Sequence, residues 1–361
     1  MLAADSFGPK GVLLYCRSGF EKECAQEITQ RMLTLEVQGY VKAQPDQAYL
    51  LFYPTELEDI FEAIKRLRFR DLVFARQMIF VGDFLQSLPL KDRVGAILES
   101  IQRSGLSFSD VYLETADTNA AKSLSGFIKK FERPFKTALQ SSGMLKSGRR
   151  DSARLHLFFL DGTSLYWGYS FSGNASPWCM GIPRLRFPPG APSRSTLKLD
   201  EAFGYFVLDP DKFLMPGMRA IDLGAAPGGW TYQLVQRHIR TVAVDNGNLA
   251  PSLLDSGIVH HVRADGFKYR PEKPVDWLVC DMVEQPSRVA TLIGDWFEGG
   301  FCRYAIFNLK LPMKKRYECL EACRALIAEK LGSTGKDWRL EFKQLYHDRA
   351  EVTGYIAPLK N

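Results

Sequence analysis

The chain has 361 residues, 46% of them hydrophobic, and a formal net charge of +6. This length allows two or three domains with substantial cores, and so small a charge does not by itself identify a nucleic-acid-binding protein. No apolar run is long enough to cross a membrane, and the first ten residues lack the apolar segment of a signal peptide, so we expect a cytoplasmic protein.

The first part of the chain alternates strand and helix patterns in the order βαββαβ, which is typical of a ferredoxin-like unit. Strands are expected at residues 12–16, 35–41, 48–53 and 72–81, and the first helix at residues 20–32. Thr55 to Glu58 form a capping-box pattern, and apolar residues then follow at helical spacing (Leu57, Ile60, Phe61 and Ile64). We predict a ferredoxin-like subdomain over residues 1–85.

A second α+β subdomain is predicted over residues 86–175. Its expected elements are a helix near residues 92–102, a strand at 111–114, basic helices up to residue 140, and a strand pair at 155–160 and 164–170. Asp161 and Gly162 supply the turn that joins this strand pair.

A basic stripe lies between residues 121 and 150, where eight Lys and Arg residues accompany one acid, Glu132. The stripe has two interpretations, and both stay open. It could be the solvated face of a helix, or a surface that binds the phosphate backbone of a nucleic acid. The eight are Lys122, Lys129, Lys130, Arg133, Lys136, Lys146, Arg149 and Arg150. For the second interpretation, the candidate RNA-binding residues are Lys129, Lys130, Arg133, Lys136, Lys314 and Lys315.

Residues 176–195 are expected to form an ordered linker, because their Pro and Arg residues alternate with apolar ones. Beyond this linker, strand and helix patterns alternate seven times, which predicts a doubly wound α/β sheet within residues 176–361. The expected strands are 219–223, 241–244, 258–262, 277–281, 304–309, 340–346 and 351–357.

The most informative segment runs from Ile221 to Trp230 and reads Ile-Asp-Leu-Gly-Ala-Ala-Pro-Gly-Gly-Trp. It combines a buried strand, a glycine turn and the start of a helix, which is where doubly wound proteins bind nucleotides. The Gly-Lys-Ser/Thr of a Walker loop and the Gly-x-Gly-x-x-Gly of a dinucleotide site are both missing. The pattern instead resembles the S-adenosylmethionine (SAM) loop of Rossmann-like RNA methyltransferases.

Acidic residues at the ends of the next two strands suit the other parts of this cofactor. Asp245 ends the second strand, where a carboxylate can accept hydrogen bonds from a ribose diol. Asp265 follows the third strand and could accept from an adenine amino group, although a turn or helix cap is the ordinary alternative for such an Asp. Pro227, Gly228 and Gly229 would let backbone N–H groups approach the amino-acid end of SAM.

Four residues suit methyl transfer to a ribose hydroxyl, which needs a base to remove the hydroxyl proton. They are Lys198 on the first helix of the last domain, Asp281 and Lys310 at the ends of its fourth and fifth strands, and Glu351 at the start of its last strand. A Lys can be that base if burial and a neighbouring cation lower its pKa, an effect that carboxylates partly oppose. Taken singly, each residue has an ordinary surface explanation.

In chain order these residues spell Lys-Asp-Lys-Glu, which resembles the tetrad of the RNA 2′-O-ribose methyltransferases of the cell-division heat-shock protein J type. Longer segments resemble the ribosomal large subunit methyltransferase M family, at residues 16–21, 180–184, 193–198, 307–317 and 345–349. The resemblance implies a THUMP-like RNA-binding module before a Rossmann-like SAM-dependent domain. It also implies 2′-O-methylation of a cytidine in the peptidyl-transferase region of 23S rRNA.

Carried over to matching positions, the resemblance makes Lys310 the proton acceptor and Lys198, Asp281 and Glu351 its partners. The implied cofactor contacts are Ser195, Gly224, Ala226, Pro227, Gly228, Gly229, Asp245, Asp265 and Asp281. The expected partner is 23S rRNA or a pre-ribosomal large subunit, bound by a monomer. No metal is expected, since the seven cysteines form no Cys-x-x-Cys pair and indicate reduced thiols.

Two other functions remain as alternatives. An rRNA base methyltransferase would need Asn/Asp-Pro-Pro-Tyr after the fourth strand or a nucleophilic Cys, but the chain has Cys280-Asp281-Met282-Val283, and Cys280 should point into the core. An RNA-binding ribosome-assembly factor with a vestigial methyltransferase fold would have no need of the intact tetrad.

Overall fold

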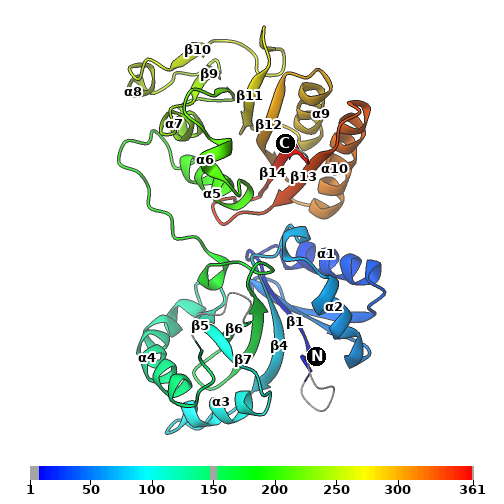
Figure 1. The fold of residues 1–361 in the computed structure, drawn as a ribbon, viewed down its shortest axis with the longest axis vertical. Coiled ribbons are helices and arrows are strands. Elements are labelled where there is room, and N and C mark those ends of the chain that lie inside the picture. Colours follow the sequence, from blue (N-terminus) through cyan, green and yellow to red (C-terminus); the bar gives the residue numbers. More distant parts are fainter. Residues whose placement is uncertain (1–7, 147–152, 360–361) are drawn as a thin grey trace. The chain divides into compact units, whose positions relative to one another are not determined.

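The computed structural model describes residues 8–146 and 153–359 (Figure 1). Contacts between residues divide the chain into two compact units, which adjoin in sequence at Pro183 and Arg184. Arg149 and Arg150 of the predicted basic stripe lie outside the described residues. None of the described helices has the length and apolar composition needed to cross a membrane.

The first half of unit 1 has the predicted ferredoxin-like topology. Its strands lie in the order β2-β3-β1-β4, each antiparallel to its neighbours. The core between sheet and helices contains fully buried apolar side chains, among them Leu14, Ile28 and Leu50. The elements are β1 (Gly11–Tyr15), α1 (Glu21–Thr34), β2 (Gly39–Ala43), β3 (Tyr49–Pro54), α2 (Ile60–Arg66) and β4 (Gln77–Leu85).

The second half of unit 1 continues the same sheet. Strand β7 pairs with β4, β6 with β7, and β5 with β6, so that seven strands lie in the order β2-β3-β1-β4-β7-β6-β5. The pairing of β5 with β6 is parallel, and the other two are antiparallel. The elements are α3 (Arg93–Gln102), β5 (Phe108–Thr115), α4 (Ser125–Ser141), β6 (Ala153–Phe159) and β7 (Leu165–Phe171).

A buried carboxylate connects the two halves of unit 1. Glu114 on β5 accepts hydrogen bonds from the Tyr15 hydroxyl (2.7 Å), from His156 Nδ1 (2.8 Å) and from the backbone N–H of Met180 (2.5 Å). Burial raises the pKa of Glu114, but His156 and the hydrogen bonds outweigh this and hold it below its usual value. The segment that follows β7 is therefore fastened to strands from both halves.

Two strands differ from their predicted limits for the same reason. Glu27 accepts hydrogen bonds from the backbone N–H groups of Val73 (2.6 Å) and Phe74 (2.9 Å), so β4 begins at Gln77 and not at residue 72. Glu201 likewise accepts hydrogen bonds from the backbone N–H groups of Tyr346 and His347, so β13 (Trp338–Lys343) ends at Lys343 and not at residue 346. In both places a buried side chain replaces a neighbouring strand as the hydrogen-bond partner.

The predicted capping box at Thr55 to Glu58 is wrong. A 3₁₀ turn (Leu57–Asp59) precedes α2, and neither start is capped by a side-chain hydrogen bond. Ile60 is fully buried, but Leu57 and Phe61 are exposed, so the predicted apolar face is realised only in part.

Unit 2 is the predicted Rossmann-like fold, a seven-stranded sheet in the order β10-β9-β8-β11-β12-β14-β13 with helices on both faces (Figure 1). Its strands are β8 (Arg219–Leu223), β9 (Arg240–Val244), β10 (Val259–Val262), β11 (Val275–Cys280), β12 (Cys302–Lys310), β13 and β14 (Glu351–Pro358). Its helices are α5 (Thr196–Phe206), α6 (Pro210–Phe213), α7 (Gly229–Val235), α8 (Pro251–Leu254), α9 (Pro286–Glu298) and α10 (Arg316–Ser333).

One antiparallel strand determines where the predicted tetrad can form. The strands from β10 to β12 are parallel, whereas β14 runs antiparallel to β12 with Lys310 opposite Glu351. The first residue of β14 therefore lies at the edge where the other strands end. Aromatic residues fill the core beneath this edge, among them Phe203, Trp277 and Tyr355.

Candidate active site

A cavity of about 370 Å³ lies at the carboxyl ends of the central strands of unit 2. This volume is within the range of roughly 300–1,000 Å³ that is common for small-molecule sites. Predicted cofactor residues from four successive segments line it: Gly224, Ala226, Asp245, Asp265 and Asp281. The structure therefore brings together residues that are up to 57 positions apart in sequence, as 281 minus 224 gives.

The glycine loop needs glycine at its first turn. Gly224 has φ = 77°, and a Cβ atom there would lie 2.6 Å from Cγ of Met282. Just before it, Asp222 accepts a hydrogen bond from the hydroxyl of Thr231 (2.6 Å), which ties strand β8 to helix α7. Burial, aided by repulsion from Asp281 and Asp245, raises the pKa of Asp222 to about 7.

The two predicted carboxylates retain acceptor capacity toward the cavity. Asp245 accepts hydrogen bonds from the backbone N–H groups of Ala226 (3.0 Å) and Gly247 (2.7 Å), and Asp265 accepts one from Phe267 (2.9 Å). A carboxylate has about four lone-pair sites, so both can still accept hydrogen bonds from a ribose diol or an adenine amino group.

The other predicted cofactor residues form part of the glycine loop or of the turn that packs against it. A Cβ atom on Gly229 would collide with the hydroxyls of Ser193 and Ser195, which lie 2.6 Å apart. The carbonyl of Pro227 accepts a hydrogen bond from Ala250 (3.0 Å), and Gly228 is the left-handed residue before α7. Ser195, Pro227, Gly228 and Gly229 thus lie along the loop and its neighbouring turn, and not among the residues that line the cavity.

The four predicted tetrad residues form one network of ion pairs. Lys310 contacts Asp281 and, at 3.1 Å, Glu351, while Lys198 contacts Glu351 and, at 3.4 Å, Asp281. Their side chains are only 10–19% exposed. Each carboxylate bridges both lysines, so the two amines are held side by side next to the cofactor cavity, to which Asp281 also belongs.

The pKa of Lys310 contradicts one expectation. Burial is the largest influence and lowers the pKa, but Asp281 and Glu351, by charge and hydrogen bonding, together outweigh it, so the pKa of Lys310 is raised. The expected lowering is therefore wrong for this arrangement, because the charges and hydrogen bonds of the two carboxylates outweigh the effect of burial. For Glu351 burial raises the pKa, but Lys310 and Lys198 outweigh it and leave the pKa lowered.

Family models match three parts of the chain. A model described as the RlmM ferredoxin-like domain matches residues 10–79, one described as the N-terminal part of ribosomal RNA large subunit methyltransferase M matches residues 92–171, and one for FtsJ-like methyltransferases matches residues 191–293.

Similarity to full-length relatives is high. A protein of Methylococcus capsulatus named ribosomal RNA large subunit methyltransferase M is 56% identical over 96% of this chain and 98% of its own length. A protein of the same name from Cellvibrio japonicus is 51% identical over the same shares. The chain belongs to the ribosomal RNA large subunit methyltransferase M family. The resemblance and the fold class expected from the sequence are thereby confirmed.

The family model for FtsJ-like methyltransferases covers only part of the site. The FtsJ-like match includes Lys198, the glycine loop and Asp281, but it ends before Lys310 and Glu351. The inclusion of these last two residues in the site depends on the ion pairs and on the β12–β14 register.

Sequence reasoning missed a buried polar chain behind the tetrad. Asn308 donates to Asp281 (3.1 Å), and the Thr353 hydroxyl lies 2.8 Å from Oδ1 of Asn308 and 2.9 Å from Oδ2 of Asp348. Burial, followed by repulsion from Glu351, raises the pKa of Asp348 well above its usual value. A buried Asn within the apolar strand β12 was the signal available in the sequence.

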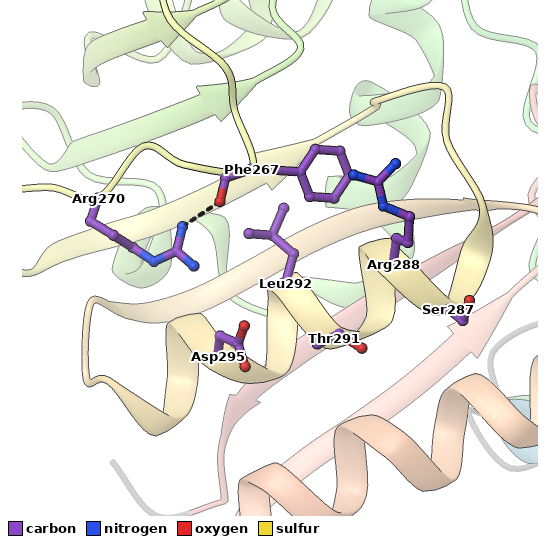
Figure 2. A pocket seen from close by; sticks show the side chains of 7 residues that line it. All are labelled: Phe267, Arg270, Ser287, Arg288, Thr291, Leu292 and Asp295. Carbon is purple, nitrogen blue, oxygen red and sulfur yellow. Dashed lines mark hydrogen bonds between the residues drawn. The ribbon is translucent and has the colours of Figure 1, made fainter.

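Phe267, which also lines the cavity, was missed as well. Figure 2, a close-up of a second pocket that Phe267 lines together with residues of α9, shows how it is held. Its carbonyl accepts a hydrogen bond from Arg270 (3.0 Å), and the guanidinium of Arg288 on α9 lies 4.5 Å from the centre of its ring. Glu284, another lining residue, pairs with Arg288 (2.5 Å). One wall of the cofactor cavity is therefore braced by α9.

The predicted RNA-binding residues lie on two separate elements. On α4, Phe127, Phe131 and Phe135 stack in a row against the sheet, and this leaves Lys129, Lys130 and Arg133 exposed. Lys136 instead pairs with Glu132 (2.7 Å). Lys314 and Lys315 are exposed in unit 2, between Lys310 and α10.

Proposed function

We propose that this chain transfers a methyl group from SAM to the ribose 2′-hydroxyl of a cytidine in the peptidyl-transferase region of 23S rRNA. The observation that carries the proposal is the meeting of Lys198, Asp281, Lys310 and Glu351 beside a cavity with acceptors for SAM. The name of the relatives supports large-subunit rRNA as the substrate.

SAM supplies a methyl group on a positively charged sulfur, which makes that carbon electrophilic. Asp245 and Asp265 would accept hydrogen bonds from its ribose and adenine, and Asp281 would place negative charge near the sulfonium. The cavity's size and unfilled acceptor sites are consistent with this assignment.

The chain's own residues would handle the hydroxyl proton. As the oxygen–methyl bond forms and the sulfur–methyl bond breaks, neutral Lys310 accepts the 2′-hydroxyl proton on Nζ. Asp281 and Glu351 fix the position of that amine, and Lys198 keeps both carboxylates in place. Because these carboxylates raise the pKa of Lys310, the enzyme must release a proton from it before each turnover.

The alternatives have less support. Cys280 is fully buried, and burial raises the pKa of its thiol to about 12, so it is a poor nucleophile for base methylation. A vestigial fold would gain nothing from two largely buried lysines held against two carboxylates, an arrangement that requires desolvating charges.

We propose α4 and residues 314–315 as surfaces for the rRNA backbone, because exposed cations bind phosphates whatever the sequence. The proposed subdomains are 1–85 (ferredoxin-like), 86–175 (THUMP-like) and 176–361 (methyltransferase, with a linker at about 176–195), and residues 176–183 of that linker belong to unit 1 by their contacts. We further propose that the protein acts as a monomer in the cytoplasm, on free 23S rRNA or on an assembling large subunit.

Mapping ribose methylation on rRNA from a deletion strain, with and without a rescue copy, tests this proposal. We expect one cytidine in the peptidyl-transferase region to lose its 2′-O-methyl group and the rescue copy to restore it. Methyl lost from a base would favour the base-methyltransferase alternative. Calorimetric SAM binding without transfer to rRNA would favour the vestigial one.

A further inference from the structure

Two apolar side chains near the candidate active site, Val283 and Met313, are almost fully exposed to solvent. Val283 is 88% exposed and Met313 is 91% exposed, and no other large apolar side chain in the described parts of the chain is as exposed. Single exposed apolar residues are common on protein surfaces, so exposure alone indicates little. Their positions are more informative.

Both residues lie within three positions of tetrad residues at the ends of neighbouring strands. Val283 comes two residues after Asp281, which follows β11, and Met313 comes three residues after Lys310, which ends β12. The two strands pair in parallel, so both loops leave the same edge of the sheet. With consecutive Cα atoms about 3.8 Å apart, each side chain is anchored within about 8 to 11 Å of its tetrad residue.

The loop that carries Val283 is fastened on both sides of it. Met282 packs against Gly224 and Gly266, where Cβ atoms would lie 2.6 Å from its Cγ and 2.9 Å from its sulfur. Glu284 is held by Arg288 (2.5 Å) and accepts a hydrogen bond from the Gln285 N–H (2.8 Å). Val283 therefore points outward because its neighbours point inward.

The loop that carries Met313 is fastened in the same manner. Leu311 is buried, and its N–H donates to the carbonyl of Ala350 (2.9 Å). Arg316 donates to the carbonyl of Pro312 (3.3 Å). Met313 is thus held in the solvent by a loop whose two ends are both fixed.

We infer that Val283 and Met313 form the contact surface for the base of the nucleotide that accepts the methyl group. This inference rests on the proposed function, because an enzyme that selects one cytidine would recognise it in an unpaired segment, where the base is unstacked and its apolar faces are exposed. A thioether and a branched aliphatic side chain suit such a face, and Met adapts to its shape. Lys314 and Lys315, which follow Met313 and are exposed, complement the adjoining phosphates.

The contact surface is tested by pairing enzyme variants with a modified substrate. Steady-state methyl transfer is measured on a 23S rRNA fragment with the accepting nucleotide intact, and on the same fragment with an abasic ribonucleotide that keeps the 2′-hydroxyl. The variants are Met313→Ser, Val283→Ser and the conservative Met313→Leu. Leu208→Ser is the matched control, since Leu208 is 74% exposed and follows α5, whose last residue lies about 12 Å along the helix axis from Lys198.

On intact RNA we expect Met313→Ser to lower kcat/KM about tenfold, the effect of losing one buried apolar contact. The dissociation constant for SAM should stay unchanged, Met313→Leu should restore activity, and Leu208→Ser should act like the wild type. On abasic RNA the wild type should already have lost the contact, so Met313→Ser and Val283→Ser should cost little more.

Equal losses on intact and abasic RNA would overturn the base contact. Full activity on intact RNA of a variant that combines Val283→Ser with Met313→Ser would overturn it too. The same variants are also measured on pre-ribosomal particles. If they lose activity there but not on the RNA fragment, the surface binds a protein partner and the base contact is overturned. If the wild type places no methyl group on ribose, the proposed function fails and the base contact fails with it.

Discussion

Lys310 determines how the rate should depend on pH. Its raised pKa means that the neutral amine is the minor form near pH 7, and its population grows about tenfold per pH unit. We expect single-turnover methyl transfer to rise with that slope between about pH 6 and 8, within the range where proteins are usually most stable. In Glu351→Gln one carboxylate charge is lost, the pKa of Lys310 falls, and the rise should move to lower pH. A profile that is flat in both enzymes would contradict Lys310 as the proton acceptor.

Removal of the amine gives a more direct test. We expect Lys310→Ala to abolish methyl transfer while leaving SAM affinity, measured by calorimetry, nearly intact, since the side chain holds carboxylates and does not line the cavity. Near-wild-type turnover in this variant would rule out its assigned role.

Asp222 should make unit 2 less stable as pH rises. Its pKa in the folded protein is about 7 against a reference value of 3.8, so its protonated form favours folding below pH 4 and this stabilisation is lost as pH rises toward 7. A shift of about three pH units corresponds to at most about 4 kcal/mol. Asp222→Asn cannot ionise, so its urea midpoint should fall less than that of the wild type between pH 5 and 8. The exposed Asp255→Asn should behave like the wild type, and identical midpoint changes in all three proteins would refute the assignment.

Residue types and positions predicted the tetrad, but not its electrostatics. Asp281 and Lys310 could be found because parallel strands end at one edge, and Glu351 because a last strand begins beside them. The sign of the pKa shift of Lys310 depends on how closely two carboxylates approach, which a linear pattern does not contain. The links through Asn308 and Thr353 depend on side-chain orientation for the same reason.

At the scale of elements, α4 offers a test of RNA binding. We expect Lys129→Gln, Lys130→Gln and Arg133→Gln together to weaken rRNA binding and to reduce the slope of log K against log salt by about two to three, at about 0.7–0.9 per phosphate contact. The control removes the same charge from exposed residues elsewhere in unit 1, with Lys42→Gln, Lys65→Gln and Arg66→Gln. Equal salt slopes in both triple variants would make the α4 face an ordinary solvated surface.

Hydrophobic periodicity was enough to predict which helices and strands exist. It was not enough to predict the residues at which they begin and end. The strands of unit 2 were all expected, and β8 has the predicted limits. By contrast, β4 and β13 are shortened by Glu27 and Glu201, which lie 46 to 145 residues away from the N–H groups that they bind. Such long-range hydrogen bonds override local propensity, and a local reading of the sequence cannot contain them.

At the scale of the whole molecule, the connection between the units is the expected site of proteolysis. Arg184 and Arg186 are exposed in a stretch without helix or strand between the 3₁₀ turn Cys179–Gly181 and α5. We expect brief trypsin treatment to give two fragments of similar size. SAM binding should remain with the carboxyl-terminal fragment and rRNA affinity mainly with the amino-terminal one. Cleavage scattered through either unit, or SAM affinity that is lost on cleavage, would contradict this division.

The shared sheet of unit 1 has a consequence during synthesis on the ribosome. Strand β4 is complete at Leu85, but its partner β7 begins only at Leu165, 80 residues later. Until those residues emerge, the ferredoxin-like half carries an unpaired strand edge that other nascent chains could pair with. Slow translation of the α3–β6 region should therefore increase aggregation of this protein more than slow translation of unit 2.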